Sequence, residues 1–105
     1  MARYIDDNLI FDSSSHVMAA ELFADFGSWL TDHGHKGWSE GSFASRMAQH
    51  ELCVAAGIER TRVRAKRGGV SRKAHSGSIG PLPERYWAWL GLRWFRTSDD
   101  RDADA

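Results

Sequence analysis

The spacing of apolar side chains changes at Gly57, and this change most constrains how the chain can fold. Before Gly57, apolar residues recur about every 3.6 positions, as they do on one side of an α-helix. After it, cationic and smaller side chains alternate from Arg60 to Lys66, as in a β-strand with two unlike faces. The two periods predict an α+β fold in which helices are followed by a β-hairpin.

Two helices are expected before Gly57. The first runs from Val17 to His33, with Ser13–Ser15 offering N-caps. The second begins after Ser39 and ends near Gly57, a residue suited to a left-handed C-cap. Residues 4–11, ahead of both, are expected to form a short helical segment. The inward stripe of the second helix should consist of Phe43, Met47, His50 and Val54.

Two strands are expected after Gly57. The first is the alternating segment from Arg60 to Lys66. The second is Tyr86–Phe95, which is apolar on both faces and should pack on the helices while another segment covers its second face. Between the strands, Gly68–Pro83 is rich in Gly, Pro and Ser and is predicted to be a flexible connector, too polar to pack.

The chain has 105 residues, so a single domain at residues 1–96 is expected, followed by a disordered acidic tail at residues 97–105. Common nucleotide-binding and hydrolase motifs are absent, which favours a non-catalytic protein without cofactor or metal. Asp32–His35 has metal-ligand chemistry, but no second ligand cluster accompanies it. Cys53 lies among apolar residues and should be a buried, inert thiol.

The sequence favours a cytoplasmic location. No apolar run reaches the length of about 18 residues that a membrane-spanning helix needs. The N-terminus is acidic and lacks the pattern of a secretion leader. We therefore expect no membrane partner.

Charge is unevenly distributed along a chain whose net charge is zero. Residues 1–58 carry a net charge of −5, residues 59–96 carry +8 and the tail carries −3. One third of the chain is therefore strongly cationic, which indicates a polyanionic partner. A solvated basic face is the alternative explanation.

The outward row of the second helix contains side chains that can read base edges. In a major groove Arg pairs with guanine, Gln with adenine, and Ser with either. The basic strand and loop that follow can contact phosphates or a minor groove. The predicted contacts to double-stranded DNA are Ser42, Ser45, Arg46 and Gln49 on the helix, and Arg60, Arg62, Arg64, Lys66, Arg67, Arg72 and Lys73 in the strand and loop.

Three groups of packing residues resemble the pattern of a known family. The first group is Glu21-Leu22-Phe23 with Phe26 and Trp29, which is similar to the family's E-L-Y-x-x-Y-x-x-W. The second is Trp38-Ser39 with Phe43 and Met47, which is similar to its L-S-x-x-x-F-x-x-x-L. The third is Arg85-Tyr86-Trp87 with Leu90-Gly91-Leu92, which is similar to its R-x-Y-W-x-G-L. The family is the C-terminal winged-helix domain of phage and plasmid primase-helicases of the superfamily 3 type. The resemblance covers roughly residues 3–95.

This resemblance implies a winged helix-turn-helix in a phage or mobile-element protein that acts in replication or transcription regulation. Ser42, Arg46 and Gln49 would then lie on the recognition helix, and residues 60–73 on the wing. The connector is longer and richer in glycine than a tight wing, and no helicase region precedes Met1. A free-standing relative and an excised domain both remain open.

A protein-interaction module is the alternative prediction. Trp87, Trp89, Arg93 and Phe95 are expected on one side of the last strand. Trp and Arg are enriched at the hot spots of protein interfaces. This side could bind a second copy of the chain or another protein, whereas core packing with a dimer contact would also account for it.

Overall fold

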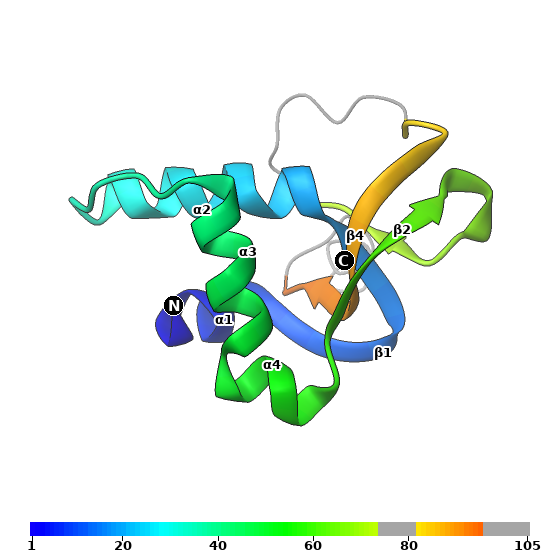
Figure 1. Ribbon diagram of the computed structural model, residues 1–105, viewed down its shortest axis with the longest axis horizontal. Coiled ribbons are helices and arrows are strands. Elements are labelled where there is room, and N and C mark those ends of the chain that lie inside the picture. The colour runs from blue at the N-terminus through cyan, green and yellow to red at the C-terminus, as the bar shows by residue number, and fades with distance from the viewer. Residues whose placement is uncertain (74–81, 96–105) are drawn as a thin grey trace, which may run out of the picture.

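A computed structural model describes residues 1–73 and 82–95. Within them the protein is an α+β structure with four α-helices, one 3-10 helix and a four-stranded mixed sheet. The elements are α1 (Ala2–Asn8), β1 (Leu9–Met18), α2 (Ala19–Asp32), α3 (Glu40–Gln49), α4 (Glu51–Ala56), β2 (Glu59–Arg64), η1 (Ala65–Arg67), β3 (Val70–Ser71) and β4 (Arg85–Trp94). Figure 1 shows the helices toward one end of the molecule, while β2, η1 and the start of β4 extend at the other.

The sheet has the strand order β2-β4-β1-β3. β4 is antiparallel to both of its neighbours, and β3 is parallel to β1. β2 pairs with β4 from Glu59 opposite Leu90 to Arg64 opposite Arg85. The two strands expected after Gly57 are therefore neighbours in one antiparallel pair.

The main core joins the helices to one face of the sheet. Phe26 lies at its centre, with ring centroids 5.0 Å from Tyr4, 5.0 Å from Trp38 and 4.7 Å from Phe43. The sheet contributes Trp89, which is 1% exposed. Because aromatic side chains bury large apolar areas, a few such anchors can hold a domain of this size together.

A smaller apolar cluster lies on the other face of the sheet. Met18, Val63, Tyr86 and Ala88 form it, and Val70 and Leu82 pack against it. These last two belong to the connector, so the prediction that residues 68–83 are too polar to pack is wrong for its described part. Ser71 is buried, and its hydroxyl accepts a hydrogen bond from the Trp94 backbone N–H at 3.0 Å. Residues 74–81 lie outside the described residues, as does the predicted tail.

The segment before α2 differs from the prediction. Of the segment 4–11 that was expected to be helical, residues 4–8 belong to α1, but the prediction is wrong for residues 9–11, which open the strand Leu9–Met18. α2 begins at Ala19 without a side-chain cap. Ser13–Ser15 are therefore not N-caps. The Asp12 carboxylate instead accepts hydrogen bonds from the Ser14 and Ser15 hydroxyls, where the pairing of β1 with β4 shifts register.

The second predicted helix is divided in two. His50 has extended backbone angles between α3 and α4, and its Nδ1 accepts a hydrogen bond from the Leu52 N–H at 3.2 Å. The break turns α4, so Cys53 is buried, whereas Val54 is 63% exposed. Val54 was thus wrongly assigned to the inward stripe. Gly57 has φ 71° and ends α4 as predicted.

The inward side of β4 changes phase at Gly91. Trp89, Leu92 and Trp94 all belong to the main core, although strict alternation would place Trp89 and Leu92 on opposite faces. Gly91 has φ 92°, and this left-handed conformation accommodates the change. The prediction that Trp89 shares an outer side with Phe95 is therefore wrong.

Candidate nucleic-acid interface

A row of arginines projects from one face of the β2–β4 pair. Val63 is buried in the smaller cluster, so its neighbours Arg62 and Arg64 point to the opposite face. Arg60 is paired with Trp89, and directly paired residues of antiparallel strands share a face. Because Trp89 packs under the helices, this row lies on the helix-bearing side of the sheet.

Strand pairing adds to this row a residue that was not among the predicted DNA contacts. Arg85 is directly opposite Arg64, so it belongs to the same face. Finding it required the register of β2 against β4, which periodicity alone does not give. We call Arg60, Arg62, Arg64 and Arg85 the β2 basic surface.

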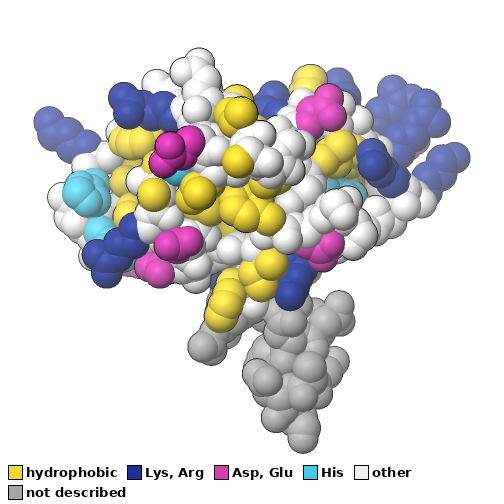
Figure 2. Space-filling view, turned by 90° about the horizontal axis from the view of Figure 1, so that it is seen from below, with side chains coloured by type: hydrophobic (Ala, Val, Ile, Leu, Met, Phe, Trp, Pro, Cys, Tyr) yellow, Lys and Arg dark blue, Asp and Glu magenta, His cyan; other side chains and the backbone are white. Residues whose placement is uncertain are grey.

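No carboxylate within residues 1–73 and 82–95 forms an ion pair with the β2 basic surface. Arg62, Arg64 and Arg85 are exposed, and Arg60 is partly buried. Figure 2 shows several Lys and Arg side chains at the end of the molecule that carries β2 and η1 in Figure 1, and others at the opposite, helical end. A cluster of positive charges raises the local concentration of anionic ligands.

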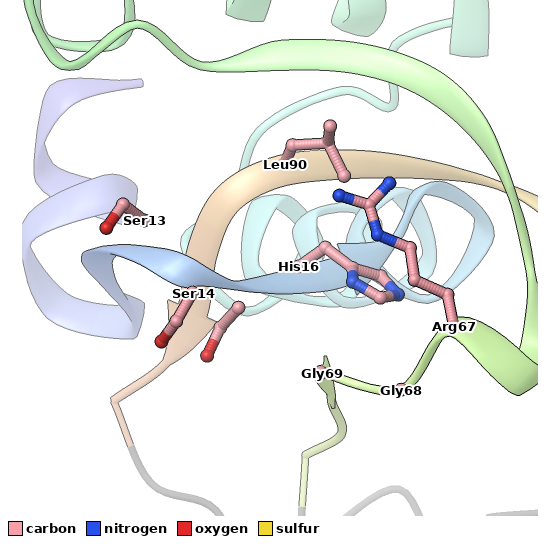
Figure 3. Close-up of a pocket in the computed structure, with 8 residues that line it drawn as sticks. Ser13, Ser14, His16, Arg67, Gly68, Gly69 and Leu90 are labelled. Atoms are coloured by element: carbon pink, nitrogen blue, oxygen red, sulfur yellow. The ribbon is translucent and has the colours of Figure 1, made fainter.

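Lys66 and Arg67 follow this row in η1, and both are exposed. Arg67 does not continue the row. It lines a pocket of about 290 Å³ with Ser13–Ser15, His16, Gly68, Gly69 and Leu90. Figure 3 shows its side chain extending toward His16 and Leu90, which lie on the other face of the sheet.

His16, which lines this pocket, is held by two hydrogen-bonding contacts. Its backbone N–H donates a hydrogen bond to the Gly69 carbonyl at 3.0 Å, and its Nε2 lies 2.6 Å from the Tyr86 hydroxyl. Burial, followed by the nearby Arg67 charge, lowers the pKa of His16 from its ordinary value of 6.5. The ring is therefore neutral at pH 7 and acts as a structural link between β1 and β4.

Arg72 and Lys73 are not brought together with the β2 basic surface. The Arg72 Nε donates to a Glu21 carboxylate oxygen at 3.1 Å, and the Lys73 Nζ lies 2.6 Å from Asp25 Oδ1. Both pairs are largely sheltered from solvent. These two cations attach the connector to α2, so any contact with DNA would compete with these ion pairs.

The predicted row on α3 is exposed. Phe43 and Met47 are buried on the inner side, whereas Ser42, Ser45, Arg46 and Gln49 face solvent. Arg46 lies over the Trp38 ring, 4.9 Å from its centroid, and Gln49 Nε2 donates to the Ser45 hydroxyl at 3.4 Å. Ser39 caps the helix by accepting a hydrogen bond from the Ser42 N–H. We call these four exposed residues the α3 polar row.

The described residues contain no group of three His, Cys, Asp or Glu side chains placed to hold a metal ion. None of the helices in the same residues has the length and apolar character needed to cross a membrane. Cys53 is buried, as predicted, and this burial raises the pKa of its thiol. Comparisons with family models, curated proteins and solved structures find no match for this chain.

Proposed function

We propose that this chain is a non-catalytic, double-stranded DNA-binding protein with a winged-helix fold. A winged helix joins a helix-turn-helix to a β-hairpin wing. The order α2, α3, β2, β4 and the antiparallel arrangement β2-β4-β1 support this assignment. The resemblance noted in the sequence suggests a role in phage or mobile-element replication or transcription regulation.

The β2 basic surface is the observation that carries the proposal. Its arginines lie on the helix-bearing side of the sheet and have no carboxylate partner within the described residues. The strand that carries three of them, β2, runs away from α4 toward the end of the molecule opposite the helices (Figure 1). Such a row suits the phosphates of a duplex, since cations that contact phosphates release condensed counterions. The α3 polar row would supply base readout in the major groove.

Salt dependence provides the test. Fluorescence anisotropy with a labelled short duplex should show binding that weakens as salt rises from about 50 to 200 mM. Each phosphate contact contributes a slope of about −0.9 in log affinity against log salt, so the double variant Arg62→Gln/Arg64→Gln should reduce the slope by about 1.8. Arg46→Ala should instead relax base preference by about 1–3 kcal/mol.

Arg3→Gln is the matched control, because it removes an exposed positive charge on α1 that is paired with Asp7. It should leave the slope almost unchanged. Absence of duplex binding at low salt would refute the proposal. If the slope fell by the same amount per removed charge in Arg3→Gln and in the double variant, only total charge would matter.

The alternative function, a protein-interaction module that binds through one side of the last strand, has weaker support. Trp89 is 1% exposed and is therefore not available to a partner. Trp87 and Phe95 remain exposed, but Gly91 and the phase change lie between them, so they do not form one side of β4. Light scattering at increasing protein concentration would detect self-association through either residue.

A further inference from the structure

Trp87 stands apart from the other tryptophans of the sheet. Its side chain is 47% exposed, whereas Trp89 and Trp94, on the same strand, are each 1% exposed. Trp87 is two residues from Trp89 and on the same face, but it lies beyond the part of the sheet that the helices cover. Folding of the described residues therefore leaves a large aromatic surface in solvent.

The surroundings of Trp87 are cationic. Arg60 lies over one side of its ring, 4.6 Å from the centroid, and Arg62 is directly opposite on β2. Arg85 is two residues away on the same strand and face, and Arg64 lies directly opposite Arg85 on β2. A ligand of this site must therefore offer negative charge together with a flat apolar face.

A nucleotide with an unpaired base has this combination. Bases stack on aromatic side chains in single-strand-binding proteins, while arginines contact the phosphates and add cation-π interactions. The bases of an intact duplex are stacked on one another, so an indole reaches a base face only after local unstacking or at a single-stranded segment.

We infer that Trp87 is a stacking platform for an unpaired base, which makes the preferred ligand a DNA duplex with a single-stranded extension. This inference rests on the proposed DNA-binding function and specifies its substrate class. The duplex occupies the α3 polar row and the β2 arginines. The first unpaired base stacks on the solvent-exposed part of the Trp87 ring, with Arg60 beside it.

The experiment compares three ligands of the same labelled sequence: a blunt duplex, the duplex with an extension of about six nucleotides, and the extension alone. Anisotropy should show that the extended duplex binds about 5- to 100-fold more tightly than the blunt duplex. The extended duplex should also quench tryptophan fluorescence, and the blunt duplex should not.

Trp87→Ala should abolish the preference and keep the affinity for the blunt duplex, while Trp87→Phe should retain part of the preference and lose the quenching. Phe95→Ala is the matched control, since Phe95 is similarly exposed at 48% and lies just past the other end of β4. It should change neither measurement. Thermal melting monitored by circular dichroism checks that each variant folds.

The outcomes separate this inference from the function on which it rests. Equal affinity for the blunt and the extended duplex would refute the stacking platform and leave duplex binding intact. A preference that persists in Trp87→Ala, or quenching that persists in Trp87→Phe, would also refute it. Failure to bind any of the three ligands would refute the DNA-binding function itself. If an acidic peptide bound through Trp87 while all DNA failed to bind, the surface would be a protein interface.

Discussion

Replacing Gly91 by alanine tests the phase change of β4, which separates the buried Trp89 from the strand end at Phe95. Gly91 has φ 92°, a conformation that residues with a Cβ rarely adopt. An added Cβ would lie 2.9 Å from Ile58 Cδ1. Left-handed backbone costs about 1–2 kcal/mol in a residue other than glycine. The steric contact adds less, because Cδ1 is the far end of a flexible side chain.

We therefore expect Gly91→Ala to lower the free energy of unfolding by about 1–3 kcal/mol, a large part of the margin of a small domain. Urea denaturation followed by far-ultraviolet circular dichroism measures the change. Gly27→Ala is the control, because Gly27 lies inside α2, has no positive φ, and its Cβ would meet nothing within 4 Å. It should stabilise the protein by about 0.5–1 kcal/mol.

A Gly91→Ala variant as stable as the unmodified protein would refute the role given to this glycine. In that case the strand would accommodate a Cβ at position 91, and the phase change would not require glycine. A loss of stability in Gly27→Ala of the same size would show a general sensitivity to added volume.

Two further predictions concern titratable groups. Because the pKa of His16 is lowered in the folded state, the unfolded chain takes up the proton first as pH falls through 6.5. The free energy of unfolding should therefore decrease from about pH 7 to about pH 5. His16→Gln should remove the contribution of His16 to this decrease, which melting curves recorded at a series of pH values would measure. Equal pH profiles for both proteins would contradict it. Cys53 is buried with a raised pKa, so iodoacetamide should alkylate it only after urea unfolds the chain, and rapid labelling of the folded protein would contradict the assignment.

Sequence patterns correctly predicted the helices, caps and strands that are determined by residues close to one another in the sequence. The stripe of Leu22, Phe26 and Leu30 is buried in α2, Ser39 caps α3, and Gly57 ends α4. The alternation from Arg60 gives β2. In each case the deciding contacts lie within a few residues, so periodicity and capping rules suffice.

Features that depend on distant partners were missed. β1 contains the polar run Asp12–Ser15, which interrupts any alternation, and it is a strand because it pairs with β4 about 75 residues later. Arg72 lies 51 positions from Glu21, and Lys73 lies 48 positions from Asp25. No rule based on spacing identifies such pairs, so the sequence overstated how many cations of the connector are available.

Carboxylates neutralise only some of the basic residues in 59–96, so the remaining charge still supports the proposed nucleic-acid interface. Nine of the ten basic residues belong to the part of the chain that the structure describes, and three of these, Arg72, Lys73 and Arg93, pair with Glu21, Asp25 and Asp12. The bases without a carboxylate partner in the described residues are Arg60, Arg62, Arg64, Lys66, Arg67 and Arg85. The acids of the N-terminal half thus fix the connector and the part of β1 where its pairing shifts register, while the β2–β4 pair keeps its charge. Since like charges gathered on one strand pair cost stability, their concentration there favours a binding role over a solvated basic face.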